Sequence, residues 1–148
     1  MKTSMRNLML VVTLTVLAGC ASTVPMVSKE QDATSKAFKA PSPGKSGLYI
    51  YRNNFVGKAL KKSLSVDGVA IGTSANGVFF HREIASGPHT LSTESEFGDN
   101  TLTFTSEAGK NYYFRQYIKM GVFSGGSGIE SVTEDEGQKG VLECREAK

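Results

Sequence analysis

The chain has two histidines, His81 and His89, and imidazole is a common protein ligand for zinc. A metal site built on them would need carboxylates such as Glu83 or Glu94 to complete the shell. Nothing in the spacing fixes these side chains within reach of one another, and a histidine on a strand surface is usually structural. The sequence therefore predicts no metal and no cofactor. A small-ligand or metal carrier that uses both histidines remains the alternative function.

Catalytic chemistry finds less support. Serine hydrolases of the α/β type place their nucleophile in G-x-S-x-G, and Ser127 in the run 125–128 has the wrong spacing. The glycines of this run could cradle an anion through their amides. They lack the lysine of a phosphate loop, so a mobile hairpin loop is the favoured interpretation. The acids at Glu134, Asp135 and Glu136 fit helix capping better than acid–base catalysis. The prediction is that the chain is not an enzyme.

Cys20 is the residue with the clearest chemistry. Two small residues precede it, so a peptidase could approach the backbone beside it, and an apolar stretch over 8–18 follows Lys2 and Arg6. At eleven residues that stretch is too short to span a bilayer, which needs roughly 20 residues. The pattern resembles a lipoprotein signal with the lipobox Leu17, Ala18, Gly19 and the acylated residue Cys20. The rival interpretation is an ordinary cleaved secretory signal.

Acylation would make Cys20 the first residue of the mature protein and would attach it to a lipid bilayer. Each buried methylene contributes about 0.8 kcal/mol, so two or three acyl chains give a stable anchor. Ala21 follows, where Asp tends to retain lipoproteins of enteric bacteria in the inner membrane. The expected location is therefore the cell envelope, at the outer membrane and facing the periplasm.

The charge balance argues against nucleic acid as a partner. The chain has 17 basic and 14 acidic residues, and two of the basic residues, Lys2 and Arg6, lie in the predicted signal. The mature chain would be close to neutral and has no basic stripe. The second cysteine, Cys144, has no cysteine or histidine near it in sequence. We expect it to be buried and inert.

The composition divides the mature chain into two parts. Residues 20–44 are rich in Ser, Lys, Ala and Pro, with few large apolar groups, and predict a flexible tether after the signal at 1–19. Met26, Val27 and Phe38 are too sparse to build a core there. Residues 45–148 form the predicted folded domain.

Short alternating runs in this domain predict antiparallel β structure. The expected strands cover 48–52, 64–66, 69–71, 78–84, 89–93, 101–105 and 112–120, with turns at Asp67-Gly68 and Asn76-Gly77. Asp-Gly between two apolar runs is the strongest of the hairpin signals. About seven strands at this spacing indicate a β-sandwich, and a small closed barrel is the alternative.

The longest run, 112–120, has two unlike faces. Phe114, Gln116 and Ile118 alternate with Tyr113, Arg115 and Tyr117. We expect the first set to face the core. The second set is a possible interaction surface, because tyrosine beside cations suits recognition, although such stripes more often simply cover a sheet. The glycine-rich segment 121–128 is a second candidate contact region.

The C-terminal part predicts a short helix over about 133–143. Thr133 and Glu136 have capping-box spacing, and acids in the first turn suit the positive end of the helix dipole. Gly137, Gly140 and Cys144 would share the face that docks on the sheet. A hairpin that turns at Gly137 is the open alternative.

Turn motifs carry a resemblance to a bacterial lipoprotein family, domain of unknown function 2846. They are Val66-Asp67-Gly68 with Ile71-Gly72, Asn76-Gly77, and Gly87-Pro88-His89-Thr90-Leu91, after the run 49–52. Similar spacing occurs in PEGA-type modules, which are small transthyretin-like or immunoglobulin-like sandwiches, with Pro-Gly in place of Gly-Pro. The resemblance covers about 41–144. It implies a β-sandwich in the cell envelope and supplies no catalytic residues.

These observations favour a non-enzymatic envelope lipoprotein, a structural or interaction module that contacts another envelope protein or the cell wall.

Overall fold

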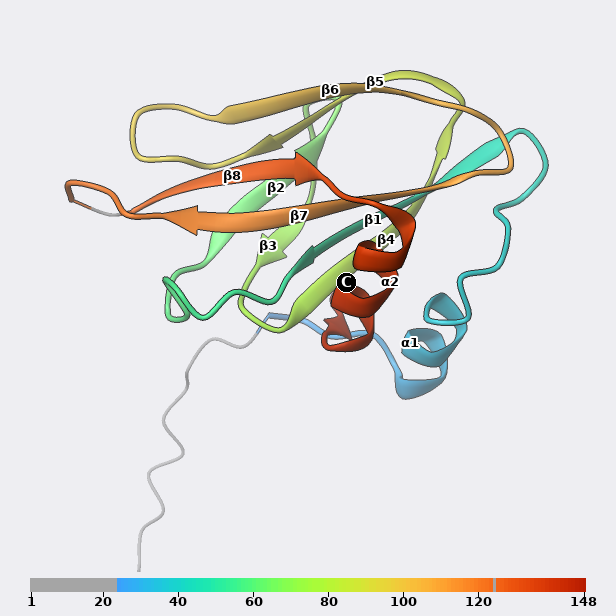
Figure 1. Cartoon of the computed structure of the whole chain (residues 1–148), viewed down its shortest axis with the longest axis horizontal. Coiled ribbons are helices and arrows are strands. Elements are labelled where there is room, and N and C mark those ends of the chain that lie inside the picture. Colours follow the sequence, from blue (N-terminus) through green and yellow to red (C-terminus); the bar gives the residue numbers. More distant parts are fainter. Residues whose placement is uncertain (1–23, 124) are drawn as a thin grey trace, which may run out of the picture.

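Two β-sheets pack face to face in the computed structural model, which describes residues 24–123 and 125–148 (Figure 1). The predicted signal and lipobox, Leu17 to Cys20, lie outside the described residues. Within them, the five-stranded sheet has the order β8-β7-β1-β4-β9 and the four-stranded sheet the order β3-β2-β5-β6. The strands are β1 Lys45–Arg52, β2 Lys62–Val66, β3 Val69–Ser74, β4 Val78–Ala85, β5 Gly87–Thr93, β6 Asn100–Ser106, β7 Asn111–Lys119, β8 Gly126–Ser131 and β9 Arg145–Glu146. The helices are α1 Lys29–Ser35 and α2 Glu134–Leu142.

Strand β1 lies at the centre of the larger sheet, antiparallel to β4 and parallel to β7. Its alternate residues Leu48 and Ile50 point between the sheets, where they join a cluster with Phe80, Leu91 and Phe114. Burying such side chains stabilises the fold by about 1.5–3 kcal/mol each. The predicted β-sandwich is confirmed, with nine strands in the described residues where the sequence predicts about seven.

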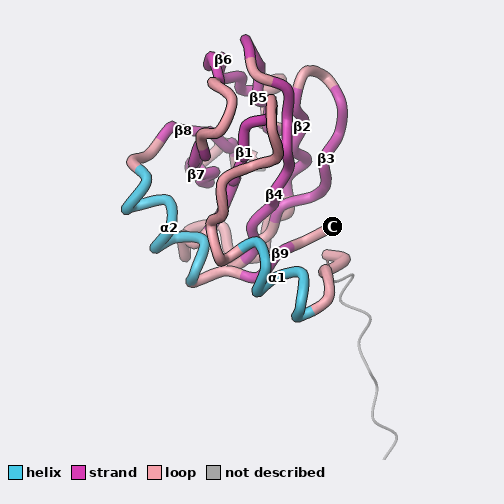
Figure 2. The backbone as a smooth tube through the Cα atoms, turned by 90° about the vertical axis from the view of Figure 1, so that its right-hand side faces the viewer, coloured by secondary structure: helices cyan, strands magenta, loops and turns pink. Residues whose placement is uncertain are grey.

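The other face of the larger sheet is also covered. Tyr49, Tyr51 and Tyr113 are at most 3% exposed and form a second cluster with Val141 and Cys144. Helix α2 lies across this face, and α1 lies on the same side of the sandwich (Figure 2). Because β1 is covered on both faces, its residues are buried without alternation from Ser46 to Arg52.

The hairpin prediction at Asp67-Gly68 is confirmed. The turn joins β2 to β3, and its two residues have φ of 51° and 78°. Positive φ at both central residues matches the right-handed twist of the flanking strands, and Asp and Gly tolerate it. The glycine run differs from its prediction, because Gly126 to Gly128 belong to β8 and Ser127 is fully buried.

The prediction of a flexible tether over 20–44 does not hold for the part that the structure describes. Val24 joins the core between the sheets, and α1 packs beside the chain's end, where the Glu146 amide donates to Asp32 at 2.7 Å. The Tyr49 hydroxyl donates to the Ser35 carbonyl at 3.0 Å. Phe38 packs on Tyr49 with ring centroids 5.6 Å apart. These few apolar groups suffice because the partners they bury against come from distant strands.

The helix prediction for 133–143 is confirmed, and the alternative hairpin at Gly137 is wrong. Thr133 is the N-cap, and its hydroxyl accepts from the Glu136 amide at 3.3 Å. Cys144 is buried as expected, and burial raises the pKa of its thiol to about 12. Within the described residues, no helix is long and apolar enough to cross a membrane.

Candidate functional site

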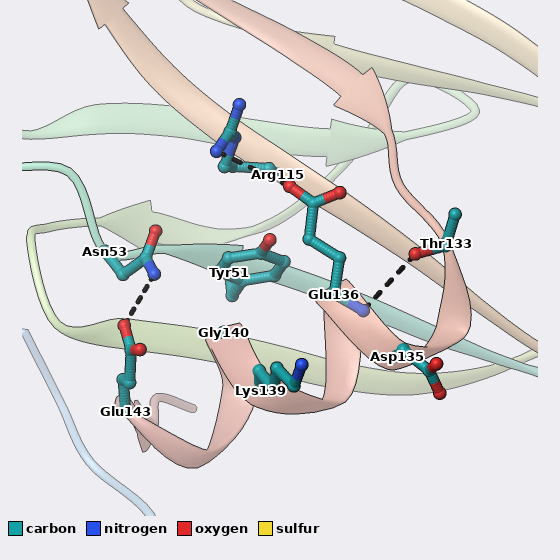
Figure 3. A pocket seen from close by; sticks show the side chains of 9 residues that line it. All are labelled: Tyr51, Asn53, Arg115, Thr133, Asp135, Glu136, Lys139, Gly140 and Glu143. Carbon is teal, nitrogen blue, oxygen red and sulfur yellow. Dashed lines mark hydrogen bonds and ion pairs between the residues drawn. The ribbon is translucent and has the colours of Figure 1, made fainter.

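A polar depression of about 350 Å³ lies where α2 crosses the outer face of β1 and β7 (Figure 3). The strands and the loop after β1 form its floor, and α2 forms one wall. The lining residues are Tyr51, Asn53, Arg115, Thr133, Asp135, Glu136, Lys139, Gly140 and Glu143. None of the nine is Ser, Cys or His, so the depression offers hydrogen bonds and charges.

Arg115 is the central cation of this depression. Its Nε donates to Glu130 Oε1 at 2.7 Å, and its Nη1 lies 3.6 Å from Glu136 Oε1. The hydrogen bond with Glu130 raises the pKa of the guanidinium. Two carboxylates thus compensate Arg115 and hold it in place. A ligand of this site would have to exchange with Glu136, the longer and weaker of the two contacts.

The floor of the depression is a buried phenol. Tyr51 is 2% exposed, and burial raises its pKa to about 12. The hydroxyl therefore stays protonated at neutral pH and can donate but not act as a base. At the rim, Asn53 Nδ2 donates to Glu143 Oε2 at 2.7 Å, which ties the loop after β1 to the end of α2. The arrangement suits binding of a polar group that carries charge or hydrogen-bonding atoms.

The predicted interaction surface is only partly exposed. Tyr113 is 3% exposed beneath α2 and belongs to the second cluster, so it cannot contact a partner. Arg115 and Tyr117 are half-buried, and Lys119 lies over the Tyr117 ring at 5.5 Å. The alternation of the strand places Tyr113 correctly on the outer face, but that face is covered there by the helix.

The two histidines lie on different sheets and have separate partners. His81 on β4 stacks on Tyr49 with ring centroids 4.3 Å apart, and burial lowers its pKa. His89 on β5 lies 2.7 Å from Asp67 and 2.7 Å from the Ala85 carbonyl. The structure does not bring them together into one site. Across residues 24–123 and 125–148, no three His, Cys, Asp or Glu side chains converge as a metal site would require.

Sequence reasoning found only one part of a further surface, the candidate contact region 121–128, and missed the loops that lie beside it. Loops 53–61, 94–99 and 120–125 lie at one end of the sandwich (Figure 1). They expose large apolar side chains. Phe55, Phe97 and Phe123 are each more than 80% exposed. The available signal was an aromatic residue inside each polar or glycine-rich connection, where no strand or helix pattern accounts for it.

Fold and site together define a two-sheet β-sandwich whose outer face carries a helix and a polar depression. Residues 42–127 match the family described as Protein of unknown function (DUF2846), and the chain belongs to that family. An uncharacterized protein of Haemophilus influenzae is 54% identical over 125 residues, which cover 84% of this chain and 74% of that protein. No solved structure matches the chain. The resemblance expected from the turn motifs is thereby confirmed.

Proposed function

We propose that the chain is a non-enzymatic lipoprotein of the bacterial cell envelope, anchored through Cys20 and engaged with a second envelope component. The observation that carries the proposal is the sequence from Lys2 to Cys20: cations, a short apolar stretch, then Leu-Ala-Gly-Cys. Ala21 favours the outer membrane, with the domain facing the periplasm. The buried, unreactive Cys144 is compatible with an oxidising compartment, where an exposed lone thiol would be a liability.

The anchor is tested by metabolic labelling with radioactive palmitate in cells that express the full chain. We expect label in the wild type and its complete loss in Cys20→Ser, together with release from the membrane fraction. Cys144→Ala is the matched control, because it removes the other cysteine and should keep both label and location. Unlabelled wild type, or Cys20→Ser that remains labelled and membrane-bound, would refute the anchor.

The partner in this proposal is another envelope protein or the cell wall, contacted through the depression beside α2. Exposed charges of both signs, Asp135, Glu136 and Lys139, surround the half-buried Arg115 there. Polar rims of this kind suit transient contacts more than permanent ones. Arg115 would exchange Glu136 for a carboxylate of the partner without losing Glu130.

Site-specific photo-crosslinking in intact cells tests the contact. A crosslinker in place of Asp135 should yield an adduct larger than the monomer, whereas one at the exposed Thr103 on the opposite sheet should not. Lys139→Glu should weaken the adduct severalfold. Monomer alone at position 135 under all growth conditions would contradict a partner at this surface.

A small-ligand carrier is the alternative, and one observation favours it. A second depression of about 230 Å³ lies beneath α1 and is lined by Ser35, Tyr49, His81 and Glu83, among others. Native mass spectrometry of the intact protein would reveal a bound species in that case. A mass equal to the acylated chain, with no thermal shift on adding zinc or copper, would remove this alternative.

A further inference from the structure

Six apolar side chains gather at one end of the sandwich and are here named the apolar tip. They project from loops 53–61, 94–99 and 120–125, which lie together at the left of Figure 1. The members are Phe55, Val56, Phe97, Met120, Val122 and Phe123. Of the eight large hydrophobic side chains that the described residues expose, these are six. Such clustering marks an interaction site, because scattered apolar residues would be spread over the whole surface.

The loops of the apolar tip are held by specific contacts. Arg52 is buried, and its guanidinium donates to the carbonyls of Gly57 at 2.5 Å and Leu60 at 2.7 Å. These two bonds shape loop 53–61 from inside the sandwich. Gly57 lies so close to Ile118 that a Cβ on it would come within 2.5 Å of that side chain. The loop is therefore packed against the end of β7.

The other two loops are joined by Glu96. Its carboxylate accepts from the backbone amides of Val122 at 3.0 Å and Phe123 at 2.5 Å. The acid thus turns inward to the backbone, and the apolar side chains beside it project outward. A cleft of about 280 Å³ opens between loops 53–61 and 120–125, and its lining includes Val56, Leu60, Ile118, Met120 and Phe123. The cleft is lined mainly by apolar side chains and opens within the apolar tip.

Lysines flank the apolar tip. Lys58 lies 5.9 Å from the centroid of the Phe55 ring, and Lys119, at the end of β7, lies over Tyr117 at 5.5 Å. Their long apolar stems can lie along an acyl region while their ammonium groups reach phosphate. Phenylalanine projecting outward, with lysine beside it, is the composition of surfaces that lie in the interface of a bilayer.

We propose that the apolar tip inserts into the interfacial layer of a phospholipid bilayer and so orients the domain on the membrane. Single side chains project from three loops, and four of them, Phe55, Phe97, Met120 and Phe123, are more than 80% exposed. Acyl chains close around such projections, whereas a protein partner would need a matching hole for each one.

The inference rests on the proposed anchor in one respect. Val24 is already packed in the core, and only four peptide steps separate it from Cys20. An extended chain covers at most about 14 Å over four residues. An acylated Cys20 therefore keeps the domain against the bilayer, and the apolar tip adds a second attachment that fixes which end faces the lipid.

The sequence contains no tryptophan, so a single introduced indole reports on its own position. The acylated full chain with Phe123→Trp is placed in vesicles of phosphatidylethanolamine and phosphatidylglycerol whose acyl chains carry bromine. Insertion predicts an emission about twofold lower or more than in unbrominated vesicles, since bromine quenches only on close approach and the apolar face of an interfacial element reaches the acyl boundary. Phe55→Trp is the second reporter.

Val69→Trp is the matched control, because Val69 is 68% exposed on the β2–β3 hairpin at the opposite end of the sandwich. Quenching at positions 55 and 123 with none at 69 supports the inference. A chain that floats with the vesicles while 55 and 123 stay unquenched overturns it and leaves the anchor intact. Equal quenching at all three positions also overturns it. A crosslinker at position 123 that captures a protein in intact cells, with no lipid adduct, assigns the tip to a protein partner.

Discussion

At the residue scale, the contact between His89 and Asp67 beside the β2–β3 hairpin shows how charge supports the fold. His89 Nδ1 lies 2.7 Å from Asp67 Oδ2, and the Thr90 amide donates to the other oxygen of Asp67 at 2.8 Å. The hydrogen bond from His89 lowers the pKa of the Asp67 carboxyl. Burial opposes the charged form of His89, but the bonds to Asp67 and Ala85 outweigh it and raise its pKa.

These two shifts predict a pH window for the pair. The contribution of His89 is complete below its ordinary pKa of 6.5 and is lost as pH rises through its raised value. The contribution of Asp67 is complete above its ordinary 3.8 and is lost as pH falls through its lowered value. The pair therefore stabilises the fold most between those two ordinary values.

Replacing His89 with Asn tests this window. Because Asp67 is half exposed, we expect a loss of only about 0.5–1 kcal/mol in unfolding free energy near pH 5.5, and less near pH 8.5. Urea denaturation at both pH values measures the difference, and Asp67→Asn should show the same trend. A larger loss at the higher pH would contradict the assigned direction of the His89 shift.

At the scale of elements, α2 lies flat on two tyrosine rings because its contact residues are glycines. A Cβ on Gly137 would come within 2.3 Å of Tyr113, and one on Gly140 within 2.1 Å of Tyr51. Glycine inside a helix costs about 1 kcal/mol relative to alanine. The close approach of helix and sheet offsets that cost through the cluster that contains Val141 and Cys144.

Gly137→Ala separates propensity from packing. Propensity alone predicts a gain of about 1 kcal/mol, whereas the clash with the Tyr113 Cβ predicts a net loss of about 1–3 kcal/mol. The second outcome is expected, because an atom next to the backbone cannot move aside. Thermal and urea unfolding measure it. Lys139→Ala, exposed on the same helix, should stay within about 0.5 kcal/mol. A stabilised Gly137→Ala would show that α2 does not lie this close.

At the scale of the whole molecule, a buried polar chain joins the two sheets near the apolar tip. Gln116 on β7 donates to Thr93 on β5 at 2.7 Å, and Thr93 and Ser127 on β8 lie 2.8 Å apart. Ser74 on β3 donates to the Gln116 carbonyl oxygen. Gln116 is fully buried, so its amide must find partners inside the protein. These hydrogen bonds between buried side chains specify how the two sheets align at the end that carries the apolar tip.

Gln116→Ala should therefore cost about 2–4 kcal/mol, since it leaves a cavity and unpaired hydroxyl groups. Gln116→Leu fills the cavity and should recover part of that loss. Hydrogen exchange should rise in both sheets, because each loses a partner. Thr103→Ala on the exposed face of β6 is the control and should change little. A loss confined to β7 would show that the polar chain does not couple the sheets.

The elements that depend on neighbours in sequence were predictable from the sequence. The Asp67-Gly68 turn and the Thr133 cap each use side chains and amides within a few residues, so their local chemistry suffices. Alternation along 112–120 likewise separates Phe114 and Gln116 from Tyr113 and Arg115. The burial of Cys144 was also predicted, but the residue follows α2, which ends at Leu142, and does not belong to the helix.

Only the tertiary structure decided which of these faces are covered. Tyr113 is buried because α2 returns across the sheet, and Val24 and Phe38 are held by strands far along the chain. His81 and His89 are separated because consecutive strands β4 and β5 belong to different sheets. Alternation is a property of one strand, whereas burial depends on what distant segments place beside it. The apolar tip likewise exists only because the fold brings three loops that are remote in sequence to the same end of the sandwich.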